Sequence, residues 1–344
     1  MLDLQSAAMK KTLLEFTDSG IYCPKADVYL DPWRPVSKAL ISHAHADHSR
    51  WGHQHYISHE FSTPIIKHRL GSVDIASKKW GERFSIQGVQ FSFHPAGHIV
   101  GSSQIKVEHK GETWVFSGDY KTYDDGFTTP FEPQKCDVFI TECTFGIPAF
   151  KWPSQELVFD QIQGWWKENA AMGITSVLFG YSLGKAQRLS FHLREEVGPI
   201  LLHPVIHAHN EVVGSVKSLP SHQKLDKSID PKKLKTALIV APPNAQEASW
   251  LKKWLPYRTA AASGWMATRG ARRRRGYDTG FVLSDHADFY ELTQAVQATE
   301  AQHVICTHGY TDIYSRFLNS KGIYATTADT PFEDEPATTE EETA

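Results

Sequence analysis

Short segments that are apolar or alternate between apolar and polar residues, each followed by a polar residue, recur along the chain and predict strands. The predicted strands are 39–41, 91–93, 114–116, 138–140, 281–283 and 304–306. A histidine, aspartate or glutamate follows each run after a few residues. Because loops at one edge of a rigid sheet can bring their side chains together, this repetition predicts one site built from several strand ends.

The middle of the chain, from Trp152 onward, follows a different pattern. Apolar residues from Leu157 to Trp166 recur at helical spacing, and Gly173 is expected to end this helix. A second helix is predicted at 185–197. Further strands are predicted at 176–179, 200–202 and 238–240. Alternating strands and helices are typical of a parallel α/β unit.

The two patterns together predict one domain inserted into another. The first domain comprises residues 1–146 and 281–325, and the inserted α/β domain comprises residues 147–280. Residues 326–344 are rich in Thr, Glu, Pro and Ala, and this composition predicts a disordered acidic tail. The last histidines of the first domain therefore follow the insertion in the chain.

Composition narrows the class of protein without identifying its ligand. A hydrophobic content of 41% and a charged content of 22% are ordinary for a globular protein of 344 residues. The net charge of −3 means that any attraction to nucleic acid must be local. The four cysteines show no CxxC spacing, which favours reduced thiols in a cytoplasmic protein. We expect no signal peptide, because the first five residues of the chain lack a basic segment followed by an apolar core. We expect no membrane partner, because no apolar run approaches the ~20 residues of a membrane span.

The strongest chemical pattern directly follows the predicted strand 39–41. Its sequence is His43-x-His45-x-Asp47-His48. Neutral imidazoles and carboxylates bind divalent metals in proteins. His43 and His45 alternate, so their side chains point the same way if the strand continues, whereas Asp47 and His48 can turn toward a second ion. A surface cluster of histidines is the alternative interpretation.

This motif and several later residues resemble the ligand series of the metallo-β-lactamase fold. The matching residues are His43, His45, Asp47, His48, His98 and Asp119. Glu142, His286 and His308 resemble three additional motifs of the β-CASP nuclease branch of that fold. Further segments are similar to bacterial ligase-associated DNA exonucleases, at 22–24, 31–35, 96–98, 131–133, 181–188 and 284–288. The resemblance covers roughly residues 20–320 and implies a metallo-β-lactamase αββα sandwich with an inserted β-CASP-like α/β domain.

The resemblance implies two divalent metal ions. The first ion would be held by His43, His45 and His98, and the second by Asp47, His48 and His308, with Asp119 bridging both. The donor set favours zinc, and manganese also fits it. Asp31 either orients one of the ligands or forms a turn before Pro32.

Three residues would carry the chemistry. His286 matches the family position that protonates the leaving oxygen, a role that suits imidazole because its pKa lies near neutrality. Glu142 would orient His286 or keep it protonated, and Asp47 would be essential as a metal ligand. The alternatives are that Glu142 only forms hydrogen bonds and that His286 only neighbours a helix cap.

Substrate contacts are predicted in two segments. Ser182 and Lys185 lie between a strand and a helix start, where they could hold a phosphate or where Ser182 could simply cap the helix. Arg269, Arg272, Arg273 and the two arginines that follow form the one dense basic run of the sequence. This run could bind a nucleic-acid backbone or be a solvated loop.

Two further groups have a structural interpretation beside a functional one. Trp265 and Tyr277 could stack on bases or pack in the core. His203, His207 and His209 could hold a metal, but without acidic partners we interpret them as surface histidines.

Together these features predict a metal-dependent DNA nuclease, an exonuclease that hydrolyses phosphodiester bonds with a two-metal-activated water in DNA repair. The preference for DNA, and a partnership with a DNA ligase and a helicase, rest on the resemblance alone. RNA processing, hydrolysis of a small molecule and a catalytically inactive scaffold are the alternatives. The nuclease motifs count against a small substrate, and the complete ligand set counts against an inactive scaffold.

Overall fold

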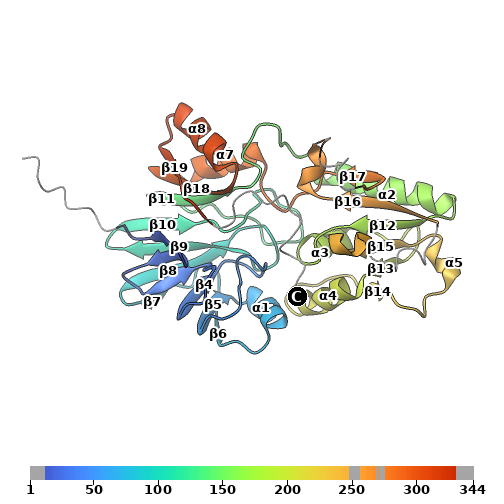
Figure 1. The fold of residues 1–344 in the computed structure, drawn as a ribbon, viewed down its shortest axis with the longest axis horizontal. Helices are drawn as coiled ribbons and strands as arrows, with labels where there is room; N and C mark the ends of the chain where they lie inside the picture. The colour runs from blue at the N-terminus through green and yellow to red at the C-terminus, as the bar shows by residue number, and fades with distance from the viewer. Residues whose placement is uncertain (1–11, 248–255, 269, 271–275, 331–344) are drawn as a thin grey trace, which may run out of the picture.

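A computed structural model describes residues 12–247, 256–268, 270 and 276–330 of the chain (Figure 1). The described residues form three sheets with helices beside them, which confirms the predicted α/β class. None of the helices in these ranges is long and apolar enough to cross a membrane.

The first two sheets contain most of the predicted strands. The first has the order β1-β2-β3-β4-β5-β6, with β1 (Glu15–Thr17), β2 (Gly20–Cys23), β3 (Val28–Leu30), β4 (Lys38–Ile41), β5 (His55–His59) and β6 (Ile75–Lys78). The second has the order β19-β18-β11-β10-β9-β8-β7, with β7 (Phe84–Ile86), β8 (Val89–Pro95), β9 (Ser103–His109), β10 (Glu112–Phe116), β11 (Val138–Cys143), β18 (His303–Gly309) and β19 (Ala325–Thr327). The predicted strands 39–41, 91–93, 114–116, 138–140 and 304–306 all lie in these two sheets.

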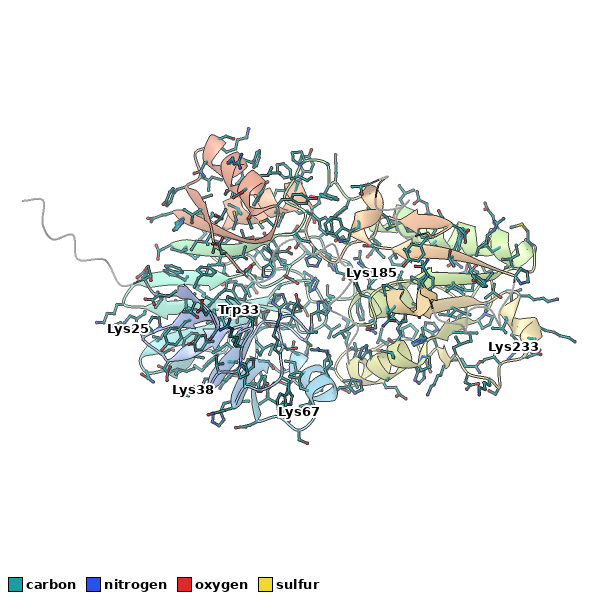
Figure 2. All side chains as sticks on the ribbon, viewed as in Figure 1. Lys25, Trp33, Lys38, Lys67, Lys185 and Lys233 are labelled. Atoms are coloured by element: carbon teal, nitrogen blue, oxygen red, sulfur yellow. The ribbon has the colours of Figure 1, made fainter. Side chains whose placement is uncertain are left out.

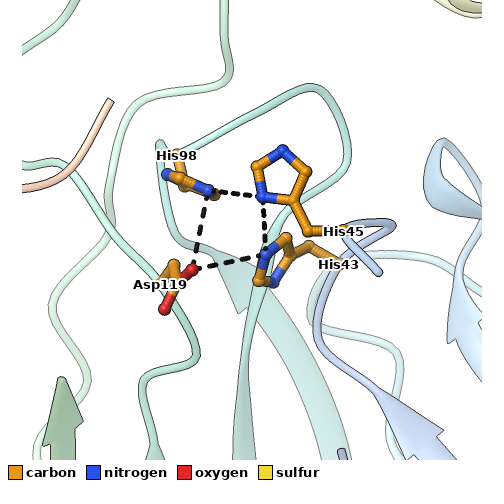
Figure 3. Close-up of side chains that lie close together, drawn as sticks. All are labelled: His43, His45, His98 and Asp119. Carbon is orange, nitrogen blue, oxygen red and sulfur yellow. Dashed lines mark hydrogen bonds and ion pairs between the residues drawn. The ribbon is translucent and has the colours of Figure 1, made fainter. Parts of the chain in front are cut away.

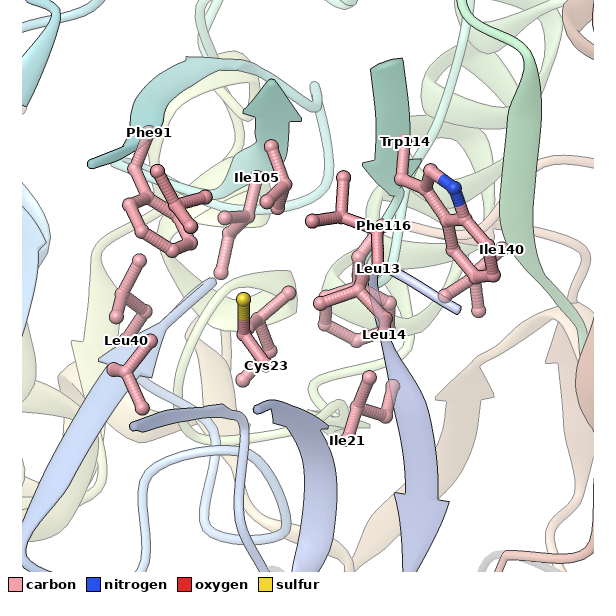
Figure 4. Close-up of a cluster of buried hydrophobic side chains, with 14 of the residues drawn as sticks. Leu13, Leu14, Ile21, Cys23, Leu40, Phe91, Ile105, Trp114, Phe116 and Ile140 are labelled. Atoms are coloured by element: carbon pink, nitrogen blue, oxygen red, sulfur yellow. The ribbon is translucent and has the colours of Figure 1, made fainter. Parts of the chain in front are cut away.

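These two sheets pack face to face around one apolar core, which includes Leu40 of β4 and Ile140 of β11 (Figure 4). Successive residues point to opposite faces, so Ile41 and Phe139 pack on the outer sides of the two sheets. The helices on these outer sides are α1 (Ser62–Leu70), α7 (Phe289–Thr299) and α8 (Thr311–Ser320). Because both faces are buried, β4 and β11 read as continuous apolar runs in the sequence.

The third sheet has the order β14-β13-β15-β12-β16-β17 and is parallel throughout, as the alternating pattern predicts. Its strands are β12 (Thr175–Phe179), β13 (Ile200–Leu202), β14 (Gln223–Lys224), β15 (Leu238–Ala241), β16 (Tyr257–Ala262) and β17 (Thr279–Phe281). Its helices are α2 (Gln155–Ala171), α3 (Lys185–His192), α4 (Pro204–Gly214) and α5 (Pro231–Leu234), with the 3-10 helices η1 (Pro243–Glu247) and η3 (Gly264–Ala267). Val158, Ile162 and Trp166 of α2 pack against Leu178 of β12, as their spacing predicts. Every strand of this sheet comes from the chain between β11 and β18.

Two expected boundaries in the middle of the chain are wrong. The helix predicted at 185–197 ends at His192, because Leu193 is extended and its side chain is buried in the core. The strand expected at 281–283 is β17, which ends at Phe281 and pairs with Ala262 of β16. The boundary expected after residue 280 therefore falls inside a strand of the third sheet.

The C-terminal boundary also differs from the expectation. Thr326 and Thr327, which we expected in a disordered tail, belong to β19. They pair with Ile305 and Cys306 of β18, so backbone hydrogen bonds outweigh the polar composition here. The acidic remainder of the tail, 331–344, lies outside the described residues.

Candidate metal centre

The loop after β4 carries the first predicted ligands. Ser49 donates a backbone hydrogen bond to the carbonyl of His45 (2.8 Å), which closes the turn over 45–49. Arg69 at the end of α1 donates to the carbonyl of Ala44 and to the hydroxyl of Ser49, both at 2.7 Å. One guanidinium therefore holds both sides of the ligand loop.

Four predicted ligands converge at the ends of β4, β8 and β10 (Figure 3). Nδ1 of His45 lies 3.2 Å from Nε2 of His43 and 3.0 Å from Nε2 of His98. Oδ2 of Asp119 lies 3.5 Å from Nε2 of His43 and 3.7 Å from Nε2 of His98. All four side chains are buried, and the structure brings their donor atoms together from separate strand ends.

Two backbone carbonyls fix which ring nitrogens of His98 and His45 carry hydrogen. Nδ1 of His98 lies 2.8 Å from the carbonyl oxygen of Asp285, and Nε2 of His45 lies 3.1 Å from that of Leu183. A carbonyl oxygen only accepts, so both of these nitrogens donate. The opposite nitrogens, which face the cluster, therefore carry lone pairs.

Asp31 fixes the remaining two imidazoles in the same way. Its carboxylate accepts hydrogen bonds from the hydroxyl of Ser42 and from Nδ1 of His48, the latter at 2.7 Å. The Ser42 hydroxyl has thus given its hydrogen to Asp31 and accepts from Nδ1 of His43 at 2.9 Å. Nε2 of His43 and Nε2 of His48 are left facing the site, as expected if Asp31 orients ligands.

The donor set fits a divalent ion in both chemistry and size. Nitrogen lone pairs that face each other at 3.0–3.2 Å repel unless a cation lies between them. Zinc–nitrogen bonds of ~2.0–2.1 Å place tetrahedral ligands ~3.3–3.4 Å apart. The observed separations of 3.0–3.7 Å bracket that value. His43, His45, His98 and Asp119 can therefore hold one ion.

A second cluster shares one oxygen with the first. Nε2 of His48 lies 3.3 Å from Oδ2 of Asp47 and 3.4 Å from Oδ2 of Asp119. The same Asp119 oxygen thus faces both clusters, which is one way in which a carboxylate can bridge two ions. His308 stacks beside His48 at 5.7 Å between ring centroids, but among the described residues it falls outside the groups whose donor atoms lie within 4.8 Å.

Burial and charge set the protonation of these groups in opposite directions. Burial lowers the pKa values of His43 and His98, which keeps both imidazoles neutral. Burial alone would lower the pKa of His48, but the carboxylates of Asp47 and Asp119 outweigh it and raise that pKa. Burial would likewise raise the pKa of Asp119, and the charge of His48 outweighs it and holds that pKa low. The carboxylates of Asp47 and Asp119 therefore favour a positive charge at the second cluster.

Two other predicted site residues, His286 and Glu142, contact each other beside the ligand clusters. Nδ1 of His286 lies 2.8 Å from Oε1 of Glu142, whose side chain is 1% exposed. Burial opposes the charged form of His286, but Glu142 outweighs it and raises the pKa of His286 to about 9. The ring of His286 lies 4.5 Å from the ring of His98, so the pair adjoins the metal ligands.

The predicted substrate residues are placed less uniformly. Lys185 is buried, and its Nζ lies 2.8 Å from Oδ2 of Asp285, so its ammonium is directed at a carboxylate of the protein. Ser182 lines a cavity of about 140 Å³ beside His45. Arg269, Arg272 and Arg273, with the rest of the basic run, lie outside the described residues.

The structure also shows the surroundings of two aromatic residues, Trp265 and Tyr277, and of one histidine, His209. The rings of Trp265 and Phe145 lie 4.9 Å apart, and those of Tyr277 and Phe179 lie 5.3 Å apart, so both residues pack in the core. His209 is buried and its Nδ1 hydrogen-bonds the carbonyl of Ser182, contrary to the expectation of a surface histidine.

Sequence analysis missed three residues that support the site, namely Arg69, Arg188 and Asp285. Arg188 and Asp285 lie in segments 181–188 and 284–288, which attracted attention only by their resemblance to known exonucleases. A single arginine in a helix has no local pattern that distinguishes a buried role from an exposed one.

The chain is similar in sequence to several proteins of known name. No family model matches it. It is 30% identical over 311 residues to a protein named "Probable DNA ligase" from Opitutus terrae, covering 89% of this chain and 30% of that protein. It is 22% identical over 184 residues to an "RNase J-like protein" from Methanocaldococcus jannaschii, covering 45% of this chain and 43% of that protein. It is 27% identical over 117 residues to "Cleavage and polyadenylation specificity factor 73" from Drosophila melanogaster, covering 32% of this chain and 17% of that protein.

These relatives support a metallo-β-lactamase/β-CASP fold for the chain. The chain spans less than half the length of each of them. A crystal structure of a protein of unknown function from Enterococcus faecalis V583 has a similar fold, with a TM-score of 0.58 and 10% identity. The similarity covers 86% of this chain and 80% of that one.

Proposed function

We propose that the chain is a metal-dependent DNA exonuclease that hydrolyses phosphodiester bonds and acts in DNA repair. The observation that carries this proposal is the position of the His286–Glu142 pair beside two ligand clusters that share one oxygen of Asp119. A phosphodiesterase needs both an activated water and a donor for the leaving oxygen, and this arrangement offers a residue for each task.

We assign the residues of the chain separate roles in this hydrolysis. Divalent ions would supply Lewis-acid activation of water and would neutralise charge on the phosphate. The two clusters, completed by His308 from β18, would hold them, and zinc or manganese suits the donors. Protonated His286 gives its proton to the leaving oxygen, and Glu142 keeps that proton available.

DNA is the proposed substrate because a relative named as a DNA ligase matches 89% of this chain. That protein carries a region like this chain within a much longer polypeptide, so we also propose a DNA ligase, with a helicase, as partners. RNA is the second candidate, because the RNase J-like protein and endoribonucleases named YSH1 match shorter parts of the chain. We further propose that Ser182 and the basic run, including Arg269, Arg272 and Arg273, contact the nucleic-acid backbone.

The test compares end-labelled single-stranded DNA, duplex DNA and RNA as substrates, each with zinc, manganese or magnesium. We expect metal-dependent release of mononucleotides from DNA, and the position of the label gives the polarity. The matched control is Asp119→Asn, which removes the bridging carboxylate and should abolish release. Faster cleavage of RNA than of DNA would favour RNA as the substrate. Cuts within the strand would indicate an endonuclease instead of an exonuclease. Activity that survives in Asp119→Asn would overturn the assignment of the site.

A further inference from the structure

A buried network of charged side chains lies where the third sheet meets the first two. It contains Lys121, Asp125, Lys185, Arg188 and Asp285, all of which are buried. Figure 2 shows Lys185 at this junction. Nζ of Lys185 lies 2.8 Å from Oδ2 of Asp285, and a guanidinium nitrogen of Arg188 lies 2.9 Å from the other oxygen. Asp285 thus receives two positive charges from one helix, α3.

Arg188 joins segments that are distant in the chain. It donates to the carbonyl of Ser284 at 2.7 Å and to Oε1 of Gln155, at the start of α2, at 2.7 and 2.9 Å. It also donates to the hydroxyl of Tyr123 and lies 3.5 Å from Oδ2 of Asp125. One side chain therefore fixes the loop before His286 against both α2 and the loop that follows Asp119.

The backbone of Asp285 connects this network to the metal centre. Its carbonyl accepts the hydrogen bond from Nδ1 of His98, and that bond fixes the tautomer of this ligand. The next residue is His286, whose carbonyl accepts a hydrogen bond from Nε1 of Trp152 at 2.9 Å. A shift of Asp285 would therefore move one metal ligand and the neighbouring proton donor together.

Stability alone gives a weak reason for such a network. Removing two charges from water costs several kcal/mol per ion, and apolar side chains of similar volume often replace buried ion pairs without loss. The network also contains three basic side chains and two carboxylates, so its acidic and basic groups are not matched one to one. Three of its contacts instead reach the loop that supplies both the carbonyl for His98 and the imidazole of His286.

We infer that Arg188 and Asp285 form a positioning unit that sets the affinity of the first metal cluster through His98. The unit also sets the placement of His286, and this second part rests on the proposed function. Zinc affinity can be measured without turnover, so the effect of the unit on metal binding is tested separately from its effect on His286.

The first experiment measures zinc affinity by competition with a chromophoric chelator in Asp285→Asn, Arg188→Gln and the double variant. Loss of such a supporting partner typically weakens metal affinity by ~10–100-fold, and we expect each single variant to fall in that range. Because the two residues act as a unit, the double variant should bind zinc no more weakly than the weaker single variant. Folded single variants with unchanged zinc affinity, or losses that multiply in the double variant, would overturn the inference.

Two further variants keep the test decisive. Glu195→Gln is the matched control, because it breaks the 3.0 Å ion pair with His222 in the third-sheet unit without touching the network. It should leave zinc affinity unchanged, and a loss as large as in Asp285→Asn would make the effect a general one. Gln155→Leu removes a single acceptor of Arg188 and serves if the charge variants do not fold. It should weaken zinc affinity by a few-fold, and no change would count against the inference.

Cobalt substitution gives a spectroscopic measurement of the metal site. The absorption bands would not change if Arg188 and Asp285 only stabilised the fold. With cobalt in place of zinc, Asp285→Asn should change the visible absorption bands, because the His98 ring is reoriented, whereas Glu195→Gln should not. With the nuclease substrate, Arg188→Gln should lower kcat while KM stays unchanged. If the wild-type protein cleaves no nucleic acid, the proposed function fails, while the zinc and cobalt results still decide the role of Arg188 and Asp285.

Discussion

The carboxylate of Glu142 and the imidazole of His286 meet at 2.8 Å, although 144 residues separate them in the chain. Glu142 lies in β11 of the second sheet, whereas His286 follows β17 of the third sheet. Because Glu142 is nearly inaccessible to water, its charge acts strongly on the imidazole and raises the pKa of His286 to about 9. The contact therefore keeps His286 protonated across the neutral pH range.

Replacement of His286 should separate proton donation from metal binding. His286→Ala should keep its metals but lose ~10²–10⁴-fold in kcat, the usual contribution of a general acid. The measurements are elemental analysis and single-turnover kinetics. A substrate with a better leaving group should recover part of the rate, because its oxygen needs less protonation. Loss of metal from this variant would show that His286 is a ligand.

Replacement of Glu142 should change the pH dependence of the rate. A general acid works in its protonated form, so kcat should fall as the pH rises through the pKa of His286. Glu142→Gln removes the charge that raises this pKa, so the alkaline limb of the kcat profile should move to lower pH. An unmoved limb, measured in the same buffers and metal, would assign the alkaline limb to another group.

Removal of Asp47 should affect the metal site more than the fold. Its carboxylate lies 3.3 Å from Nε2 of His48, and its side chain is 28% exposed, so little packing is lost in Asp47→Ala. Activity should disappear while the melting temperature, measured with chelator present, changes by less than about 2 °C. Asp74→Ala, which removes an exposed carboxylate paired with His55, is the control and should stay active.

Metal removal should lower stability and activity together. Elemental analysis of protein purified without chelator should show about two ions per chain. A ligand that binds only the folded state at 100 times its Kd stabilises that state by about 2.7 kcal/mol, so chelation should lower the melting temperature. Added zinc or manganese should restore both properties. Full activity in metal-free protein would contradict the proposed chemistry.

Glu291 gives a test of stability that is independent of the site. Burial raises the pKa of this helix-capping carboxyl to about 7 in the folded protein. The folded state then binds more protons than the unfolded state between about pH 4.5 and 7, so stability falls as the pH rises through this window. Glu291→Gln removes the penalty and should raise the melting temperature at pH 8 but not at pH 4. The expected rise is roughly 2–4 °C, which corresponds to about 1 kcal/mol in a domain of 150–250 residues. Equal effects at both pH values would contradict the pKa shift.

The sequence predicts the elements and the candidate ligands of this site because both depend on local patterns. β4 and β11 are buried on both faces, so their apolar runs are visible in the sequence, and the ligands follow them directly. The sequence leaves two roles open for Asp31, one in orienting a ligand and one in a turn, because its partner His48 lies 17 residues away. In the structure its carboxylate accepts hydrogen bonds from Ser42 and His48, the contacts that a ligand-orienting role requires.

The long-range partners could not be predicted in this way. Lys185 looks in sequence like a phosphate-binding lysine at a helix start, but Asp285 approaches it from a distant loop. The end of α3 was placed too late because burial of Leu193, a tertiary effect, stops the helix before its sequence pattern ends. The strand at Thr326 was missed because its pairing with β18 outweighs a polar composition.

The parallel pairing of β11 with β18 has a consequence for synthesis of the chain. Thr141 and Thr307 share a hydrogen bond across a sequence separation of 166 residues. At ~5–20 residues per second, a ribosome needs roughly 8–33 s to make the intervening chain. During that time β11 is an open sheet edge, and His308 does not yet exist. A nascent chain therefore cannot bring His308 beside His48 until the third sheet has been made, whereas His43, His45, His98 and Asp119 are all present much earlier.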